Sequence, residues 1–261
     1  MTTDILDVLL KLRTQGEAFA VATVIETVGS SSAKAGAKLV INREGSVVAG
    51  WVGGGCVEYA TCQTALQCLV DGTTAVIELD LNSNEVGVGM PCGGSMRVYV
   101  EPVLPKPTLW IVGHGRVVEC LCMLGDLAGF KVVVKGPAAD PARFPAAAQL
   151  MASDIKFSDL HILPSDFIII ATQHKGDHDS MKESLQSKAG YIALIASHKR
   201  AHLILDYLRQ QGFSDTNLER VMTPAGLDLG AQAPEEIALS VISEIVMIRR
   251  NGTGMRMRNL R

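Results

Sequence analysis

Two cysteines lie inside glycine-rich loops of the sequence, Cys56 in GWVGGGCVEYA (50–60) and Cys92 in MPCGGS (90–95). A run of glycines usually marks a sharp turn or a close approach of the backbone to another group. Cys56 comes at the predicted start of a helix, where outward-pointing amides and the positive helix end favour a thiolate over a thiol. Because the thiolate is the reactive form of cysteine, we interpret Cys56 and Cys92 as candidate functional thiols that could meet at one site. The alternative is that both are small, inert residues that fill space beside turns.

The other four cysteines carry no such signal, and we expect them to be inert: they are Cys62, Cys68, Cys120 and Cys122. No pair of the six cysteines follows the C-x-x-C spacing, which gives little support to a structural zinc site. The first residues have the pattern of an amphipathic helix and not of a secretion signal. The cysteines therefore predict reduced thiols in the cytoplasm instead of a disulfide framework.

A second stretch that could do chemistry is Gly113-His114-Gly115, which follows a predicted strand and opens a predicted helix. In a dinucleotide-binding fold the first glycine permits the turn, and the second lets a pyrophosphate approach the backbone at the helix N-terminus. We therefore assign Gly113, His114, Gly115 and Arg116 as candidate phosphate contacts. The third glycine of the G-x-G-x-x-G pattern is absent, because Val118 stands in its place.

Lys135 occupies the end of the next predicted strand, where NAD-binding proteins carry an acid that holds the ribose hydroxyls. A lysine cannot accept protons from those hydroxyls, but it can meet an additional phosphate. Three interpretations stay open: a ligand related to NADP, a different phosphorylated nucleotide, or a Rossmann domain that serves as a scaffold without a ligand.

The segment ATQHKGDHDS (171–180) follows a buried predicted strand, at the edge where ligands bind in open parallel sheets. Its two histidines and two carboxylates, on His174, Asp177, His178 and Asp179, could bind a metal. The alternative that we favour is a solvated loop whose polar residues cap the following helix. We keep His174 as a candidate ligand contact.

The composition is typical of an α/β protein and excludes two classes of partner. The chain of 261 residues is 48% hydrophobic, 20% charged and 5% aromatic, a profile common among proteins with parallel sheets. Its net charge of −3 gives no electrostatic case for nucleic acid. No apolar run is long enough to span a bilayer, so we expect no membrane association.

Three prolines within EPVLPKP (101–107) predict a linker, and we place a domain boundary at residue 104. Residues 1–104 combine predicted strands, short turns and helices, typical of a small α+β domain. Residues 105–261 alternate strands with helices, which predicts a Rossmann-like α/β domain with a doubly wound parallel sheet.

Four segments, spread over nearly the whole chain, match a known family. They are the loop GSSSAKAGAKLVI, the turn GWVGGGCVE, the strand entry MPCGGSMRVYVEP and the closing stretch TPAGLDLGAQAPEEIALSVISEIV. Through them the sequence resembles the XdhC/CoxI family, the xanthine dehydrogenase accessory factors.

The resemblance implies a maturation factor for molybdenum hydroxylases of the xanthine dehydrogenase, aldehyde oxidoreductase or carbon monoxide dehydrogenase type. Such a factor binds the molybdenum cofactor, a molybdopterin in mono- or dinucleotide form, and protects it while a cysteine desulfurase supports its sulfuration. It then inserts the cofactor into the apoenzyme, so the chain is expected to be an accessory chaperone more than an enzyme. A homodimer is the expected assembly.

The resemblance also implies roles for the glycine loops. Cys56 and Cys92 become candidate contacts of the molybdenum, because a soft metal suits thiolates, and Glu58 could hydrogen-bond a pterin ring. We expect the cofactor in a cleft between the two domains, with its phosphate or nucleotide end at the phosphate loop. The remaining cofactor-binding candidates of the glycine loops are Gly54, Gly55 and Gly93.

Two rival functions stay open. An NADP-dependent oxidoreductase would need a proton donor near the nicotinamide, and His174 or His114 would have to serve. The missing third glycine and the missing strand-end acid weigh against it. The other rival is a non-catalytic nucleotide-binding scaffold.

Overall fold

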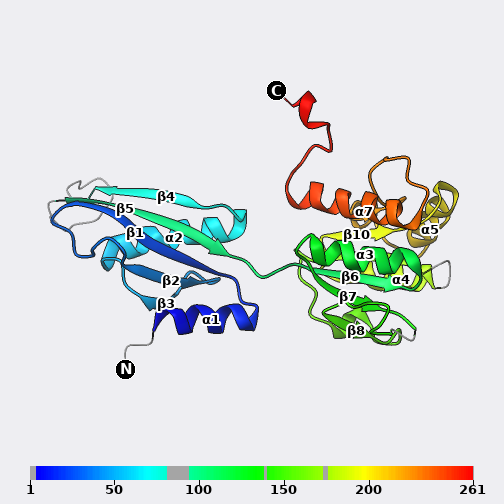
Figure 1. Cartoon of the computed structure of the whole chain (residues 1–261), viewed down its shortest axis with the longest axis horizontal. Helices are drawn as coiled ribbons and strands as arrows, with labels where there is room; N and C mark the ends of the chain where they lie inside the picture. The colour runs from blue at the N-terminus through cyan, green and yellow to red at the C-terminus, as the bar shows by residue number, and fades with distance from the viewer. Residues whose placement is uncertain (1–3, 81–93, 138–139, 173–175, 261) are drawn as a thin grey trace. The chain divides into compact units, whose positions relative to one another are not determined.

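The structure, a computed structural model, describes residues 4–80, 94–137, 140–172 and 176–260. The chain divides into two compact units, Met1–Pro105 and Lys106–Arg261. The boundary expected at residue 104 lies one residue before this division. Each unit has its own sheet and its own hydrophobic clusters (Figure 1).

Unit 1 contains an antiparallel five-stranded sheet in the order β3-β2-β1-β5-β4. The two longest strands, β1 and β5, pair from Phe19 opposite Val103 to Gly29 opposite Gly94. A bulge between Val24 and Glu26 shifts the register of this pair. The strands are β1 (Phe19–Gly29), β2 (Lys38–Asn42), β3 (Val47–Gly50), β4 (Ala75–Asp80) and β5 (Gly94–Val103).

Two helices cover the sheet of unit 1. Helix α2 (Gly55–Asp71) packs on β1, β4 and β5 over a cluster of fully buried aliphatic side chains that includes Leu39 and Val98. Helix α1 (Ile5–Gln15) packs its half-buried apolar side chains on a smaller cluster around Phe19. The alternation of buried and exposed residues along β5 follows from the period of two that any strand imposes.

Unit 2 contains a six-stranded sheet in the order β11-β10-β9-β6-β7-β8, with every pair parallel. The strand order reverses between β6 and β9, which makes their carboxyl ends the topological switch point of a doubly wound sheet. The predicted fold class is confirmed by this sheet together with the antiparallel one of unit 1. The strands are β6 (Thr108–Gly113), β7 (Lys131–Lys135), β8 (Gln149–Met151), β9 (Phe167–Ala171), β10 (Tyr191–Leu194) and β11 (Val221–Met222).

Helices cover both faces of the parallel sheet. Successive residues of β6 alternate between two clusters: Leu109 packs with α3 (Arg116–Leu127) and α7 (Pro234–Arg249), and Trp110 with α4 (Asp177–Gln186) and α5 (His198–Gln210). The second cluster also takes in the short 3-10 helix Phe157–Asp159 and α6 (Asp215–Leu218). This two-sided burial explains why the central strands have continuous apolar sequences.

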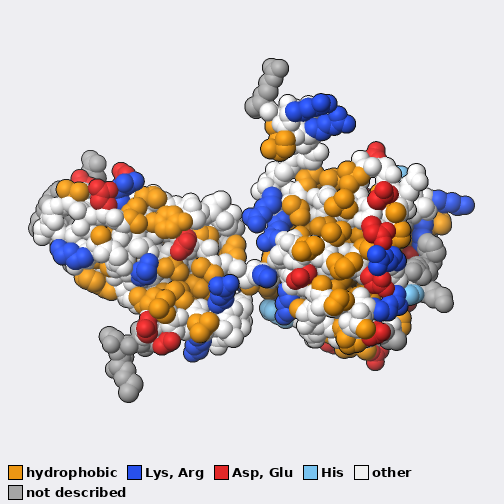
Figure 2. Space-filling view, in the orientation of Figure 1, with side chains coloured by type: hydrophobic (Ala, Val, Ile, Leu, Met, Phe, Trp, Pro, Cys, Tyr) orange, Lys and Arg blue, Asp and Glu red, His pale blue; other side chains and the backbone are white. Residues whose placement is uncertain are grey.

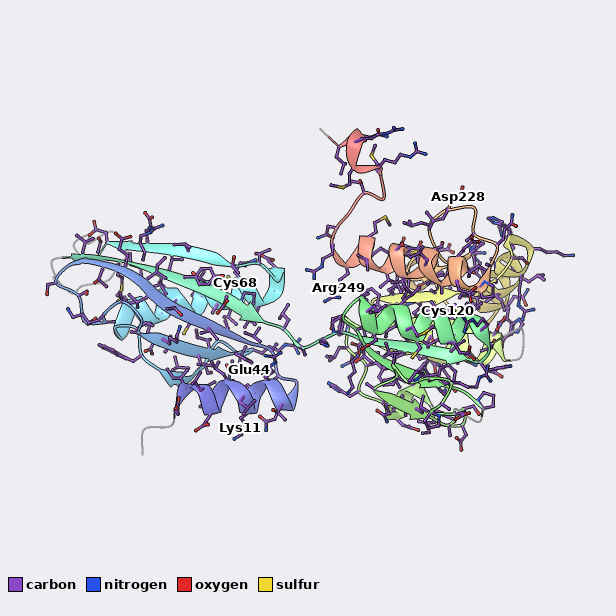
Figure 3. All side chains as sticks on the ribbon, viewed as in Figure 1. Lys11, Glu44, Cys68, Cys120, Asp228 and Arg249 are labelled. Atoms are coloured by element: carbon purple, nitrogen blue, oxygen red, sulfur yellow. The ribbon has the colours of Figure 1, made fainter. Side chains whose placement is uncertain are left out.

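The closing helix α7 is tied to its surroundings at both ends. At its start, Glu236 Oε2 accepts hydrogen bonds from the backbone amides of Gln232 and Ala233, at 2.8 and 2.9 Å. Near its end, Arg249 (labelled in Figure 3) lies 4.9 Å from the ring centre of Phe130. Among the described residues, no helix is long and apolar enough to cross a membrane.

Candidate functional site

A cavity of about 340 Å³ opens at the carboxyl edge of the parallel sheet in unit 2. Its walls come from the ends of the three neighbouring strands β9, β6 and β7 and from the first two turns of α4. This is the switch-point position at which open parallel sheets bind ligands. The residues that line it are Val112, Gly113, His114, Lys135, Gly136, Pro137, Ser153, Thr172, Gly176, Asp179, Ser180 and Glu183.

The turn between β6 and α3 brings the backbone into this cavity. Gly113 has φ +140°, and a Cβ placed on it would stand 2.2 Å from the carbonyl oxygen of Ala171 in β9. Only glycine fits a position with that φ and that neighbour. Gly115, with φ 93°, precedes α3 and has no side chain that could cap the first turn. A glycine turn that leads into a helix N-terminus is the arrangement expected of a phosphate loop.

Lys135 ends β7 as a buried lysine with a carboxylate partner. Its side chain is 7% exposed, and its Nζ donates to Glu183 Oε2 of α4 at 3.2 Å. The same Nζ lies 4.7 Å from the ring centre of Phe157, a favourable cation–π distance. Glu183 is the more exposed partner, at 30%, and also lines the cavity.

The wall formed by β9 and α4 is fixed by a buried aspartate. Asp177, the first residue of α4, accepts a short hydrogen bond from Thr172 Oγ1 and a second, at 2.7 Å, from Arg200 Nε of α5. Because Asp177 is 2% exposed, the arginine supplies the charge partner that a buried carboxylate needs. Asp177 thus positions Thr172 and the start of α4, which both line the cavity.

Two of the polar candidates lie elsewhere. Arg116 is not among the cavity-lining residues; its Nε donates to Glu235 of α7 at 2.8 Å and its Nη1 lies 3.4 Å from Glu119. Its assignment as a phosphate contact stays a prediction. His178 is exposed and contacts the ring of Tyr207 edge-on, with ring centres 4.5 Å apart.

His174 lies outside the described residues, so its assignment as a ligand contact stays a prediction. Within the ranges that the structure describes, no group of three or more histidine, cysteine, aspartate or glutamate side chains could hold a metal ion.

In unit 1 the three glycines before Cys56 form the turn from β3 into α2. Gly53, Gly54 and Gly55 have φ values of 131°, 69° and 54°, a run of left-handed backbone that residues with a Cβ rarely adopt. Ser32 Oγ donates to the carbonyl oxygen of Gly53 at 3.1 Å and so ties the loop of Ser30, Ser31 and Ser32, the serine loop, to this turn. Cys56 is therefore the second residue of α2, as predicted from the sequence, and is half-buried.

Among the described residues, an acidic and two aromatic side chains lie near Cys56 in sequence. Glu58 lies in the same first turn, half-buried. The exposed side chains of Trp51 and Tyr59 stand before and after the thiol in sequence, and Trp51 Nε1 is 3.3 Å from where a Cβ on Gly54 would be. Gly54, the residue before α2, has no side chain that could cap this first turn.

The second glycine loop is described only from Gly94 onward, because Cys92 and Gly93 lie outside the described residues. Gly94 itself packs closely on the serine loop: a Cβ on it would stand 2.4 Å from the oxygen of Val28 and 2.6 Å from that of Ser30. The serine loop thus contacts both the turn before Cys56 and the start of β5. The meeting of Cys56 with Cys92 stays a prediction.

The remaining cysteines of the described chain have the properties of inert thiols. Burial raises the pKa of Cys122 to about 11, with a smaller contribution from the charge of Asp126. Burial is also the main cause of the raised pKa values of Cys62, Cys68 and Cys120. Figure 3 labels Cys68 on α2 and Cys120 on α3, where both side chains are buried. A raised pKa keeps these sulfurs protonated and weakly nucleophilic.

Sequence reasoning missed Glu183 and Thr172 as residues of the cavity. Glu183 is one polar residue within an ordinary amphipathic helix, and only the packing of α4 beside β7 brings it to Lys135. Thr172 could have been found, because it follows the buried strand β9 at the edge where the sequence predicted a ligand site.

Comparison with models of known protein families identifies the family of this chain. The family model described as the XdhC Rossmann domain matches residues 109–245, and that of the XdhC and CoxI family matches residues 12–80. The chain belongs to the XdhC/CoxI family. The first match covers most of unit 2 and the second covers the serine loop and the turn before Cys56, so the resemblance seen in the sequence is confirmed.

Three curated relatives resemble this XdhC-family chain. The Escherichia coli protein YqeB is 29% identical over 251 residues, which are 94% of this chain and 46% of YqeB. A Bacillus subtilis protein named as a probable xanthine dehydrogenase component is 29% identical over 59% of this chain and 46% of its own length. The molybdenum cofactor insertion chaperone PaoD of Escherichia coli is 22% identical over 90% of this chain and 84% of PaoD. The chain spans about half the length of the first two.

One solved structure extends the likeness to the fold. A xanthine dehydrogenase from Bacillus halodurans superposes with a TM-score of 0.51 at 22% identity, covering 98% of this XdhC-family chain and 97% of the other. At that identity the likeness concerns the fold alone.

Proposed function

We propose that this chain is a maturation factor that binds the molybdenum cofactor and delivers it to a molybdenum hydroxylase. The observation that carries the proposal is the turn of three left-handed glycines that places Cys56 in the uncapped first turn of α2, within the segment matched by the XdhC and CoxI family model. The likeness to PaoD over 90% of the chain supports it.

For unit 1 we propose that Cys56 contacts the molybdenum or its sulfur ligand. The donor set fits such a cargo, because a thiolate suits a soft metal and the positive end of α2 suits an anionic ligand. The close glycines leave room for a large planar group to approach the backbone. We propose that Glu58, half-buried in the same turn, accepts a hydrogen bond from an N–H group of the pterin. Cys92 is the proposed second thiol.

For unit 2 we propose that the switch-point cavity binds the phosphate or nucleotide end of the cofactor. Gly113 and Gly115 give the backbone access, and the uncapped end of α3 supplies amide donors. His114 lines the same cavity and is the proposed side-chain contact to phosphate.

The proposed partners follow from the proposed cargo. An apo molybdenum hydroxylase would receive the cofactor, and a cysteine desulfurase would supply its terminal sulfur while this chain protects it. A homodimer is the assembly that we propose, and the cytoplasm, where cofactor and client are made, is the proposed location.

Cofactor retention tests the proposal. The full chain would be purified without oxygen from cells that make the cofactor, then assayed for pterin by fluorescence after oxidation and for molybdenum by mass spectrometry. We expect both to copurify in a fixed ratio. Cys56→Ala should lower the retained molybdenum roughly tenfold or more, since each tenfold corresponds to the loss of about 1.4 kcal/mol of binding.

Cys62→Ala is the matched control, because Cys62 is a second half-buried cysteine on the same helix. It should retain the cofactor as the parent chain does. Equal losses from the two variants would contradict the role of Cys56, and a chain that carries neither pterin nor molybdenum would contradict the proposed function.

A further inference from the structure

We infer that the cavity of unit 2 recognises the free vicinal hydroxyls of a ribose through Glu183, and that it excludes a nucleotide with a 2′-phosphate. The inference rests on the proposed use of this cavity for the nucleotide end of the ligand. It concerns the form of the nucleotide, which neither the sequence nor the family relationship specifies.

The first step is the position of the Lys135–Glu183 pair. In a doubly wound sheet, the end of the strand next to the phosphate loop strand holds the ribose, and an acid there accepts the hydroxyl protons. In this chain β7 ends in Lys135, which has no acceptor. Glu183 of α4 reaches the same place, because its Oε2 lies 3.2 Å from Lys135 Nζ.

The second step is which member of the pair the cavity offers to a ligand. The Lys135 side chain is 7% exposed, whereas that of Glu183 is 30% exposed. The ammonium is held between Glu183 and the ring of Phe157, 4.7 Å from the ring centre. Of the two, the carboxylate is therefore the group more accessible to a ligand. An acceptor at this place suits hydroxyl donors and not a phosphate, whose oxygens are acceptors themselves.

The third step is the charge of the surrounding wall. The charged side chains that line the cavity in the described part of the chain are Lys135, Asp179 and Glu183, and the imidazole of His114 also lines it. Lys135 already pairs with Glu183, which leaves Asp179 as a further negative charge on the described wall. A 2′-phosphate beside Glu183 would add like charge to this wall without a further lysine or arginine among its described residues to meet it, which disfavours binding.

A panel of simple nucleotides tests the inference on the full chain, without any molybdenum. Calorimetric titration would compare ADP, GDP, CDP and UDP with their 2′-deoxy counterparts, and AMP with adenosine 2′,5′-bisphosphate. We expect at least one ribonucleotide to bind roughly tenfold or more tightly than its deoxy form, the usual value of a hydrogen bond to a charged group. The bisphosphate should bind more weakly than AMP.

Two variants separate the roles of the pair. Glu183→Gln should remove most of the preference for ribose, while Glu219→Gln, an exposed glutamate of the same unit, should leave it intact. Lys135→Met should keep the preference for ribose, because the carboxylate remains. A melting temperature for each variant shows that it is folded before it is titrated.

Three results would overturn the inference. The first is equal binding of ribo- and deoxynucleotides. The second is that the bisphosphate binds more tightly than AMP and that Lys135→Met abolishes this difference. The third is that no nucleotide in the panel binds. None of these bears on cofactor retention through Cys56, so a failure here is distinguishable from a failure of the proposed function.

Discussion

At the scale of single residues, Glu244 of α7 joins the closing helix to the sheet and to the loop before it. Its Oε2 accepts a short hydrogen bond from the Tyr191 hydroxyl of β10 and a second, at 3.0 Å, from the amide of Gly226. Ser240, one turn earlier, donates to the carbonyl oxygen of Leu227. The family-matching stretch 223–246 thus owes much of its pattern to the docking of a loop on a helix.

Tyr191→Phe should change how stability depends on pH. Burial, and then the hydrogen bond to Glu244, raise the pKa of Tyr191 above its ordinary value of 10.0. The folded protein therefore keeps the proton above pH 10 while the unfolded chain loses it. The contribution of Tyr191 to the free energy of unfolding is therefore fully present below pH 10. Above pH 10 it falls by about 1.4 kcal/mol per pH unit.

Urea unfolding at neutral and alkaline pH measures this effect. Tyr191→Phe should cost about 1 to 3 kcal/mol at neutral pH, since Glu244 loses a donor, and the cost should shrink as the pH rises above about 10. Tyr59→Phe, at an exposed position, serves as the control. A cost for Tyr191→Phe that does not vary with pH would show that Tyr191 titrates normally in the folded state.

At the scale of elements, the contact between β6 and β9 sets the floor of the cavity. Gly113 ends β6 opposite Ala171 of β9, and the Cβ position on Gly113 is occupied by the carbonyl of Ala171. The strands are therefore held at a separation that no side chain at residue 113 would allow.

Gly113→Ala should destabilise unit 2 by at least about 3 kcal/mol, because it combines an unfavourable φ with a backbone clash. Gly212→Ala separates the two causes: its φ is +88°, and no atom that the structure describes lies within 4 Å of the added Cβ. That variant should lose only about 1 to 2 kcal/mol. Chemical denaturation of both would settle the comparison, and equal losses would mean that the close approach costs nothing.

Most elements could be predicted from the sequence, because buried side chains recur about every two residues along a strand and about every 3.6 residues along a helix. The strand predicted before the phosphate loop is β6, and the helix predicted to follow the loop is α3. The short β8 was missed, since three residues are too few to show a period. Its place in the sheet comes from pairing with β7.

The candidate site was predictable only where the backbone carries the signal. The glycines at 53–55 and Gly113 indicate turns in the sequence, because few other residues adopt the backbone conformations found there. Lys135 stood out as an anomaly in the sequence, but its meaning changed once Glu183, distant in sequence, was seen to neutralise it. Arg116 follows the phosphate loop in sequence, yet its side chain pairs with Glu235 of the last helix. Long-range partners of this kind leave no local pattern.

At the scale of the whole molecule, the two units have separate hydrophobic clusters that share no residue. Figure 2 shows apolar side chains over α3 and α7 of unit 2, where Met123, Leu127 and Leu239 are exposed. Unit 1 completes its core with its own helices α1 and α2. Each unit therefore has what a domain needs to fold.

Core variants should act on one unit at a time. Ile41→Ala and Ile169→Ala both empty fully buried positions, the first in unit 1 and the second in unit 2. Each should cost its own unit about 2 to 5 kcal/mol. Hydrogen exchange with mass spectrometry of the full chain would locate the lost protection, and each variant is the control for the other. Loss of protection throughout the chain from either variant would mean that the units unfold together.

The neutralised pair at the end of β7 also bears on the salt concentration at which a nucleotide stays bound. Lys135 and Glu183 cancel each other's formal charge, so the pair offers a hydroxyl a directed hydrogen bond and adds no net charge to the cavity. Dissolved ions screen charges over about 8 Å at physiological ionic strength, which weakens attraction between net charges far more than a short hydrogen bond. A ribose held there should remain in place at ionic strengths that would release an anion held by charge alone.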